Sequence, residues 1–429
     1  MAEEDWNLFK KPEYITNLDR MPIHHKILSH QRQRVNRANT SRQVQKSSEK
    51  FPKHQHRDRR ATRSSIANSD LWLDFNVDAP IEESDEEEET VAKTVETSEL
   101  IYTNSCKKFG VTPREMVIKH LATERLSISD GRLRRNDIQP ITYSLTMNSV
   151  VTILDISGNN IGSDSFKQFI RMLEENVSIT ELDVSYNDLR SEGAKLLGQL
   201  LCSKNNLLSL NASGNEFEND DASYFSEGLK QNYSLLKLNL SNNNFHEQGG
   251  IKLANALDCN SSIENLDLSW NQLRLSGAVA LGNSLQKNET LKHVNLSWNG
   301  FSDIGCETIG KSLLSNSCLE TLDLSSNRIC YEGCKYLARS LVINQTLSCL
   351  KVNFNSISTR GALELLIAIR DNHNSSLSRL ELQEIPVIQS CLEIVEDIKK
   401  TRGNFQVIHD VKVLSEDFFV RCVKPKSRK

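Results

Sequence analysis

The sequence lacks any long apolar run: no stretch of 18 or more apolar residues occurs, and a membrane-spanning helix needs about 20. Its first six residues carry neither a basic flank nor an apolar stretch, so no secretory signal peptide is predicted. We therefore expect a cytoplasmic protein, with nuclear or ciliary placement as alternatives. In a reducing compartment its 10 Cys are expected to be free thiols rather than disulfides.

Signatures of catalysis and metal binding are missing as well. The patterns GxGxxG, HExxH and GxSxG and the EF-hand loop do not occur, and each belongs to nucleotide, zinc, acyl-transfer or calcium chemistry. Cys330 and Cys334 have a CxxxC spacing without a second pair nearby, whereas structural zinc needs four ligands. The sequence therefore predicts that the protein binds no metal and no cofactor and is not an enzyme.

Charge is distributed unevenly along the first hundred residues. Residues 20–63 hold 13 Lys or Arg and two Asp or Glu, a balance of +11, whereas residues 82–99 hold nine acidic residues and one basic residue. Few apolar residues accompany them, so this part cannot bury enough surface to fold. We predict a disordered tail over 1–95. Nucleic acid is expected only as a partner of 20–63, and nuclear targeting is an alternative use of that segment.

The rest of the chain is dominated by a strict repeat. In each unit, as around Asn271, apolar residues stand five and three positions before an Asn and two after it: Leu266, Leu268 and Leu273. This LxLxxNxL pattern at a fixed period resembles the leucine-rich repeat and predicts a solenoid. The Asn residues recur every 28 residues without an insertion: Asn159, Asn187, Asn215, Asn243, Asn271, Asn299, Asn327 and Asn355.

Within each unit the apolar spacing changes from alternation to a helical stripe, such as Ala278, Leu281 and Leu285. A strand is therefore followed by a helix. Parallel strands stack at about 4.8 Å and helices at about 10 Å, so the array must curve. The predicted fold is an α/β horseshoe with a parallel sheet on its concave face and helices on its convex face.

Individual residues of the repeat unit have predicted structural roles. Each Asn carboxamide both donates and accepts, so a ladder of them should satisfy the loop backbone. The unit with Ala212 and Asp221 departs from the pattern and is predicted to be the least stable. Tight turns just before the helices are expected at six Gly: Gly193, Gly249, Gly277, Gly305, Gly333 and Gly361.

Both ends of the repeat array are expected to be capped. A degenerate unit with Gly131 in the Asn position comes first, and Thr112 to Glu115 predicts a capping box that opens a helix at Pro113. After the repeats we expect a strand near Leu380, a helix over 387–402 and a strand over 405–408. The predicted segments are a disordered tail over 1–95, a capping helix over 96–125, repeats over 126–385, and a cap and tail over 386–429.

Two resemblances add to this interpretation. The 28-residue unit with a Gly-Ala helix start resembles the ribonuclease-inhibitor subclass of leucine-rich repeats, also found in Nod-like receptors and Ran GTPase-activating protein. The block from Tyr102 through Cys106 and Gly110 to Pro113 resembles the leucine-rich repeat-containing protein 74 family over about residues 100–410. The second resemblance implies a horseshoe without a catalytic residue.

Strand residues between the buried Leu positions are expected to form rows on the concave face. Trp270 and Trp298 should stand side by side in the row just before the Asn, and aromatic residues in a polar surround are typical of binding hot spots. Alternatively, the acidic and Ser rows bond to each other, the Trp rings cover the loop edge and His293 is merely exposed. The predicted partner-binding residues are Trp270, Trp298, Tyr186, Phe354, Asp183, Asp267, Asp323 and His293.

The sequence therefore predicts a monomeric, non-catalytic scaffold that binds one or more proteins through its concave face. One alternative is a structural subunit of a ciliary or flagellar assembly. A second is a GTPase-activating protein of the Ran-activator type, in which Arg132, Arg134 or Arg135 would stabilise phosphoryl-transfer charge. A further hypothesis places the basic segment 20–63 on the acid-leaning concave face.

Overall fold

The computed structural model describes residues 98–410, which belong to one of two units of the chain, Ile81–Lys429. The predictions for the tail over 1–95 and for the C-terminal tail concern residues outside this part. No helix in the described range is long and apolar enough to cross a membrane.

The strands of this range form one 11-stranded parallel sheet in chain order. Residues 28 apart pair across it, for example Leu154 with Leu182. Leu350 pairs with Leu380, because two residues are added to the repeat after Asn372. The predicted register is confirmed. The strands are β1 Arg125–Ser127, β2 Ile153–Asp155, β3 Glu181–Asp183, β4 Ser209–Asn211, β5 Lys237–Asn239, β6 Asn265–Asp267, β7 His293–Asn295, β8 Thr321–Asp323, β9 Cys349–Lys351, β10 Arg379–Glu381 and β11 Gln406–Ile408.

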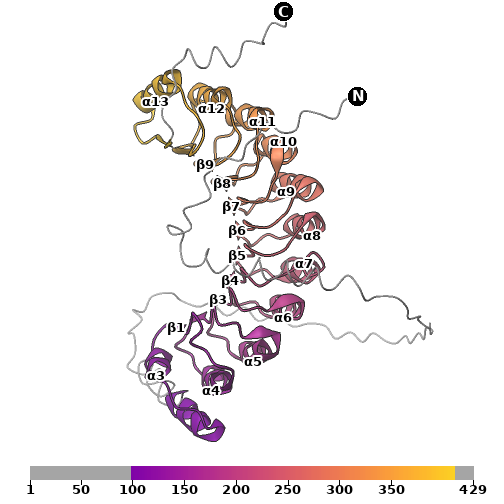
Figure 1. The fold of residues 1–429 in the computed structure, drawn as a ribbon, viewed down its shortest axis with the longest axis vertical. Helices are drawn as coiled ribbons and strands as arrows, with labels where there is room; N and C mark the ends of the chain where they lie inside the picture. Colours follow the sequence, from indigo (N-terminus) through magenta and orange to yellow (C-terminus); the bar gives the residue numbers. More distant parts are fainter. Residues whose placement is uncertain (1–97, 411–429) are drawn as a thin grey trace, which may run out of the picture. The chain divides into compact units, whose positions relative to one another are not determined.

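Helices follow the strands one by one and line the other side of the stack (Figure 1). From Arg135 onward each helix lies against the next, and the apolar stripe residues Ala278, Leu281 and Leu285 are buried as expected. The fold is therefore an α/β solenoid with strands on the inner side. The helices are α3 Glu115–Leu121, α4 Arg135–Thr146, α5 Gly162–Glu175, α6 Arg190–Ser203, α7 Ala222–Gln231, α8 Glu247–Leu257, α9 Leu275–Lys287, α10 Ser302–Leu313, α11 Tyr331–Leu341, α12 Thr359–Asp371 and α13 Gln389–Thr401.

The predicted Asn ladder is present. Every Asn from Asn159 to Asn355 donates from Nδ2 to a carbonyl 31 residues earlier, in the preceding repeat. Asn187 shows the full pattern, because its Oδ1 also accepts from the Asn159 amide at 3.1 Å. It is fully buried. The side chains thus replace the hydrogen bonds that the backbone loses when it leaves each strand.

A second Asn ladder, which the sequence analysis missed, runs along the opposite edge, where helices lead into strands. Asn176, for example, donates to the Leu145 carbonyl at 2.7 Å and to the Asn148 carbonyl at 2.9 Å. Its Oδ1 accepts from the amides two and three residues later. The same bonds recur at Asn232, Asn260, Asn288, Asn316 and Asn344. A 28-residue spacing in the sequence would have revealed it.

Lys204 occupies the one position of this ladder between Asn176 and Asn232 that is not Asn. It is 8% exposed, and its ammonium donates to the Asn176 carbonyl. An ammonium cannot accept, so Lys204 cannot supply the oxygen that each Asn offers to the following amides. Burial lowers its pKa from the ordinary 10.5.

We predict that Lys204→Asn raises the free energy of unfolding at pH 7 by about 1–2 kcal/mol, because it removes a buried charge and restores the ladder. The unfolded chain binds more protons than the folded chain between the lowered pKa and 10.5, so wild-type stability should rise with pH across that window. Urea unfolding from pH 7 to 10.5 measures both effects. The exposed Lys237→Asn is the control. Equal stability of Lys204→Asn and wild type would contradict the prediction.

The prediction of tight turns at the six Gly is wrong. These residues lie inside the first turn of their helices. None of them has a left-handed φ. A Cβ at Gly277 would lie 2.9 Å from the Glu247 carbonyl oxygen of the preceding repeat. At Gly277 the small residue is therefore required by the close approach of successive helices, not by backbone freedom.

Gly277→Ala should accordingly lower the free energy of unfolding by about 1–3 kcal/mol, because the added methyl group would push adjacent helices apart. Chemical denaturation of the full chain measures the loss. Gly403→Ala is the control, since nothing lies within 4 Å of a Cβ placed there. Equal stability of the two variants would contradict the packing explanation.

The unit with Ala212 is built differently from its neighbours. Helix α7 has 10 residues, and Asp221 accepts from the Glu218 amide at 2.8 Å and from the Ser191 hydroxyl at 3.1 Å. The rings of Phe217 and Phe225 lie 5.1 Å apart in the core beside it. Large aromatic side chains thus accompany the small Ala212. The low stability predicted for this unit stays a prediction that amide hydrogen exchange can test.

The N-terminal cap differs from the expectation of one helix. Residues 98–109 form a first helix, and α3 begins at Glu115, two residues later than predicted, without a side-chain cap. The predicted capping box is wrong because Arg114 is held extended: its amide donates to the Tyr102 hydroxyl at 3.2 Å, and its guanidinium pairs with Asp137. At the other end, α13 and β11 confirm the predicted helix and strand.

Candidate functional site

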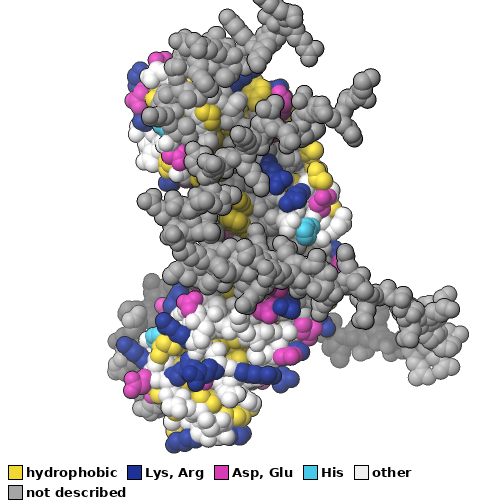
Figure 2. Space-filling view, viewed as in Figure 1, with side chains coloured by type: hydrophobic (Ala, Val, Ile, Leu, Met, Phe, Trp, Pro, Cys, Tyr) yellow, Lys and Arg dark blue, Asp and Glu magenta, His cyan; other side chains and the backbone are white. Residues whose placement is uncertain are grey.

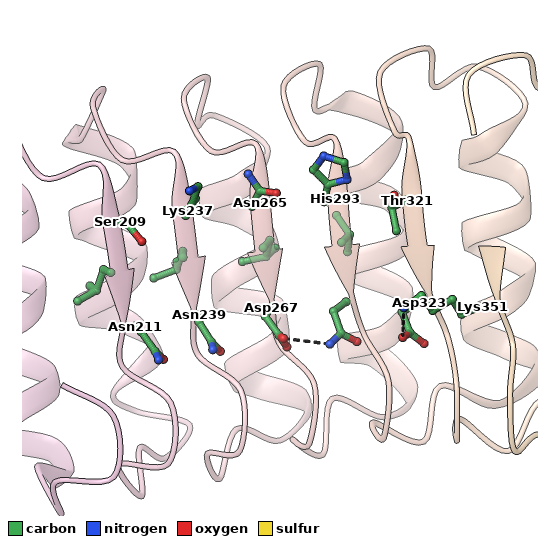
Figure 3. A pocket seen from close by; sticks show the side chains of 15 residues that line it. Ser209, Asn211, Lys237, Asn239, Asn265, Asp267, His293, Thr321, Asp323 and Lys351 are labelled. Carbon is green, nitrogen blue, oxygen red and sulfur yellow. Dashed lines mark hydrogen bonds and ion pairs between the residues drawn. The ribbon is translucent and has the colours of Figure 1, made fainter. Parts of the chain in front are cut away.

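The inner face of the sheet carries a shallow hollow of about 350 Å³ across β4 to β9. Figure 3 shows its two rows of side chains, with His293 beside Asn265 and Thr321 in one row, and Asp267 and Asp323 in the other. His293 is exposed. The structure thus brings three of the predicted site residues to one surface.

The acidic row is engaged in bonds within the chain. Asp183 accepts from Asn211 of the next strand at 2.8 Å, and Asp267 accepts in the same way from Asn295 at 2.9 Å. Asp323 lies 4.0 Å from the Lys351 ammonium. These contacts run within the acidic row, and the Ser185 hydroxyl donates to Asp183 at 2.6 Å, as in the alternative in which the acidic and Ser rows bond to each other. The carboxylates thus form a half-buried floor.

The two Trp rings lie against each other at the edge where the strands end. Their centroids are 4.1 Å apart and the ring planes differ by 12°. Trp270 is half-buried, whereas 47% of the Trp298 surface is exposed. The prediction that Trp270 and Trp298 stand side by side is confirmed.

The Trp residues stand in a row whose backbone is left-handed, a feature the sequence analysis missed. The φ of Trp270 is 55° and that of Trp298 is 58°. Asn242 and Gly214 have φ values of 55° and 66° in the same row, and these residue types tolerate such angles, whereas a bulky residue there costs about 1–2 kcal/mol. Phe354 shares the conformation and is 54% exposed. Exposed aromatic residues thus occupy positions where the backbone disfavours them.

Tyr186 stands at the far end of the same row. Its ring lies over Gly214, where a Cβ would come within 2.5 Å of it, and its hydroxyl accepts from the Asn242 side chain at 2.9 Å. Tyr186 therefore reaches to Asn242, which precedes Trp270 in the row. We call the row Tyr186, Asn242, Trp270, Trp298, Ser326 and Phe354 the aromatic edge.

Other sequence candidates lie elsewhere. Arg132, Arg134 and Arg135 are exposed around the start of α4, where Figure 2 shows Lys and Arg side chains gathering at the N-terminal end of the described part. Cys330 is exposed and Cys334 is buried, and no cluster of metal-ligating side chains occurs within residues 98–410. The nine Cys in this range are free thiols.

With this geometry in place, comparison with known sequences identifies the repeat. A profile described as "Leucine Rich repeat" matches residues 148–165, 175–198, 231–254, 259–282, 287–310, 315–338 and 344–366. These segments are leucine-rich repeats. The profile skips 199–230, the part of the leucine-rich-repeat solenoid that contains Lys204, Ala212 and Asp221. None of the curated proteins compared with the chain matches it.

Two solved structures are similar to this chain. One is the leucine-rich repeat-containing protein LegL7 from Legionella pneumophila, with 21% identity, a TM-score of 0.43, and coverage of 68% of this chain and 91% of that one. The other is described as leiomodin-1 actin-binding site 2, with 16% identity, a TM-score of 0.32, and coverage of 34% and 86%.

Proposed function

We propose that this leucine-rich-repeat chain is a non-catalytic scaffold that binds a protein partner along the aromatic edge and the adjoining inner face. The observation that carries the proposal is the stacked Trp pair in left-handed backbone positions, of which Trp298 is 47% exposed. Strained, exposed aromatic residues cluster at functional sites, and Trp is the residue type most enriched in binding hot spots.

Polar groups beside the Trp pair support the same surface. The hydroxyl oxygens of Ser325 and Ser326 are buried without a hydrogen-bond partner in the described structure. Ser326 lies between Trp298 and Phe354 in the row, and buried hydroxyls without a hydrogen bond are uncommon in native structures. Asp267, Asp323 and His293 of the adjoining hollow, with Asp183 further along the acidic row, would form its polar surround.

The proposal also includes what the sequence predicts for the whole chain. The scaffold is a cytoplasmic monomer that resembles the leucine-rich repeat-containing protein 74 family, with the repeats over 126–385. The repeat profile agrees with any leucine-rich-repeat family, so the finer resemblance rests on the block from Tyr102 to Pro113.

Capture of partner proteins from cell extract tests the proposal. The full chain and the Trp270→Asn/Trp298→Asn variant serve as baits. Loss of the same partners by the variant supports the aromatic edge as the binding surface. Equal recovery of every partner by both baits would place binding elsewhere.

A further inference from the structure

A hollow of about 470 Å³ opens on the edge opposite the aromatic edge, at the end of α6. It is lined by Glu174, Val177, Ser203, Lys204, Asn205 and Asn206. Lys204 ends α6 as its C-cap residue. The hollow therefore lies at the break in the second Asn ladder.

The Lys204 ammonium is buried without a negative partner. The residue is 8% exposed, and its only side-chain bond within the described residues is to the Asn176 carbonyl. A neutral carbonyl uses one of the three ammonium protons, and a buried charge is unfavourable unless a counter-charge meets it. Desolvation alone lowers the pKa of Lys204, which agrees with the absence of a carboxylate partner in this range.

One apolar side chain lines the hollow, and others lie further along the same edge. Val177 is 77% exposed and lines it, and the Asn206 side chain holds the Val177 carbonyl at 2.7 Å. Leu208 and Leu236 are 40% and 37% exposed on the adjacent strand starts, where the Leu236 amide donates to the Leu208 carbonyl at 2.9 Å. Large apolar side chains grouped on a surface indicate a contact site.

We propose that this hollow binds a carboxylate that is carried next to an apolar group, with Lys204 pairing the carboxylate and Val177 contacting the apolar group. A partner chain offers this chemistry as a Glu side chain or as its C-terminal carboxylate. Glu174 is the only acidic residue lining the hollow, and its charge would weaken the binding of any anion. The site is independent of the aromatic edge.

Amide chemical shifts of the ¹⁵N-labelled full chain can test the site with three small probes. N-acetyl-Leu-Leu with a free carboxylate represents a chain end, N-acetyl-Leu-Glu-amide represents a side chain, and N-acetyl-Leu-Leu-amide is the neutral control. We expect saturable shifts at Lys204, Asn205 and Asn206 with a dissociation constant of about 1 mM for one or both acidic probes. The stronger of the two identifies the source of the carboxylate.

Variants separate charge from shape. Lys204→Asn restores the residue type of the ladder and should keep the fold, but it should weaken the acidic probes about tenfold or more, as expected for a charged hydrogen bond. Glu174→Gln should tighten them. The proposal is overturned if neither acidic probe shifts these amides at 20-fold the expected dissociation constant, or if Lys204→Asn or the neutral probe gives the same titration.

Discussion

Replacing Trp270 and Trp298 together by Asn should weaken partner binding by at least about thirtyfold while leaving the solenoid folded. A hot-spot Trp contributes about 2 kcal/mol or more to binding, which corresponds to that factor. The two rings stack on each other at 4.1 Å, so changing one would leave the other without its neighbour. The double substitution therefore removes both rings of the stacked pair together.

Asn is the informative replacement because the row already uses it. Asn242 has a φ of 55° at the equivalent position of another repeat, and Asn tolerates left-handed angles better than Trp. The variant thus loses the ring stacking but gains a relaxed backbone, and its free energy of unfolding should change by less than about 2 kcal/mol. Chemical denaturation checks this before binding is compared.

Val342→Ala/Ile343→Ala is the matched control, since both side chains are large, apolar and about half exposed but lie at the end of α11. Quantitative mass spectrometry of captured proteins should show the loss for the Trp variant and not for the control. If both variants lose the same partners, general apolar exposure rather than the aromatic edge is responsible.

Asn327→Ala, a change in the first Asn ladder, should lower the free energy of unfolding by about 3–5 kcal/mol. Its Oδ1 accepts from the Asn299 and Phe301 amides, both at 3.1 Å, and its Nδ2 donates to the Leu296 carbonyl at 2.9 Å. Truncation leaves these buried groups without partners, at about 1–3 kcal/mol for each group. The side chain is fully buried, so water cannot replace it.

Urea unfolding of the full chain, followed by circular dichroism, measures this loss. The exposed Asn136→Ala in α4 is the control. A repeat array unfolds by neighbouring units, so a broadened or two-step transition is also expected. A loss below about 1 kcal/mol would show that the ladder is not a main source of stability.

The periodic part of the fold could be predicted because it depends on side chains that each unit repeats. The spacing of Leu154, Leu182 and their equivalents fixes strand register, since each pairs with a residue 28 positions away. The same logic placed Trp270 beside Trp298, because adjacent parallel strands hold equivalent residues next to each other. Patterns that recur across units thus translate directly into neighbours in space.

The parts that escaped prediction depend on contacts between units or on backbone angles. The helix start at Glu115 follows from Arg114, which binds Tyr102 and Asp137 from other segments. The position of Gly277 reflects its distance from Glu247 in the previous repeat, which no local turn pattern encodes. The left-handed aromatic edge was equally hidden, because Trp is a residue type rarely found at such angles.

Photo-crosslinking tests the central claim, that a protein partner covers the aromatic edge, most directly. With p-benzoylphenylalanine in place of Phe354, which is 54% exposed on that edge, ultraviolet light should join the full chain to a partner protein in intact cells. The adduct should disappear when Trp270→Asn/Trp298→Asn is added, and p-benzoylphenylalanine in place of Tyr224 on helix α7 should not form it. Adducts that arise only from the Tyr224 position, or that persist without the Trp pair, would contradict the claim.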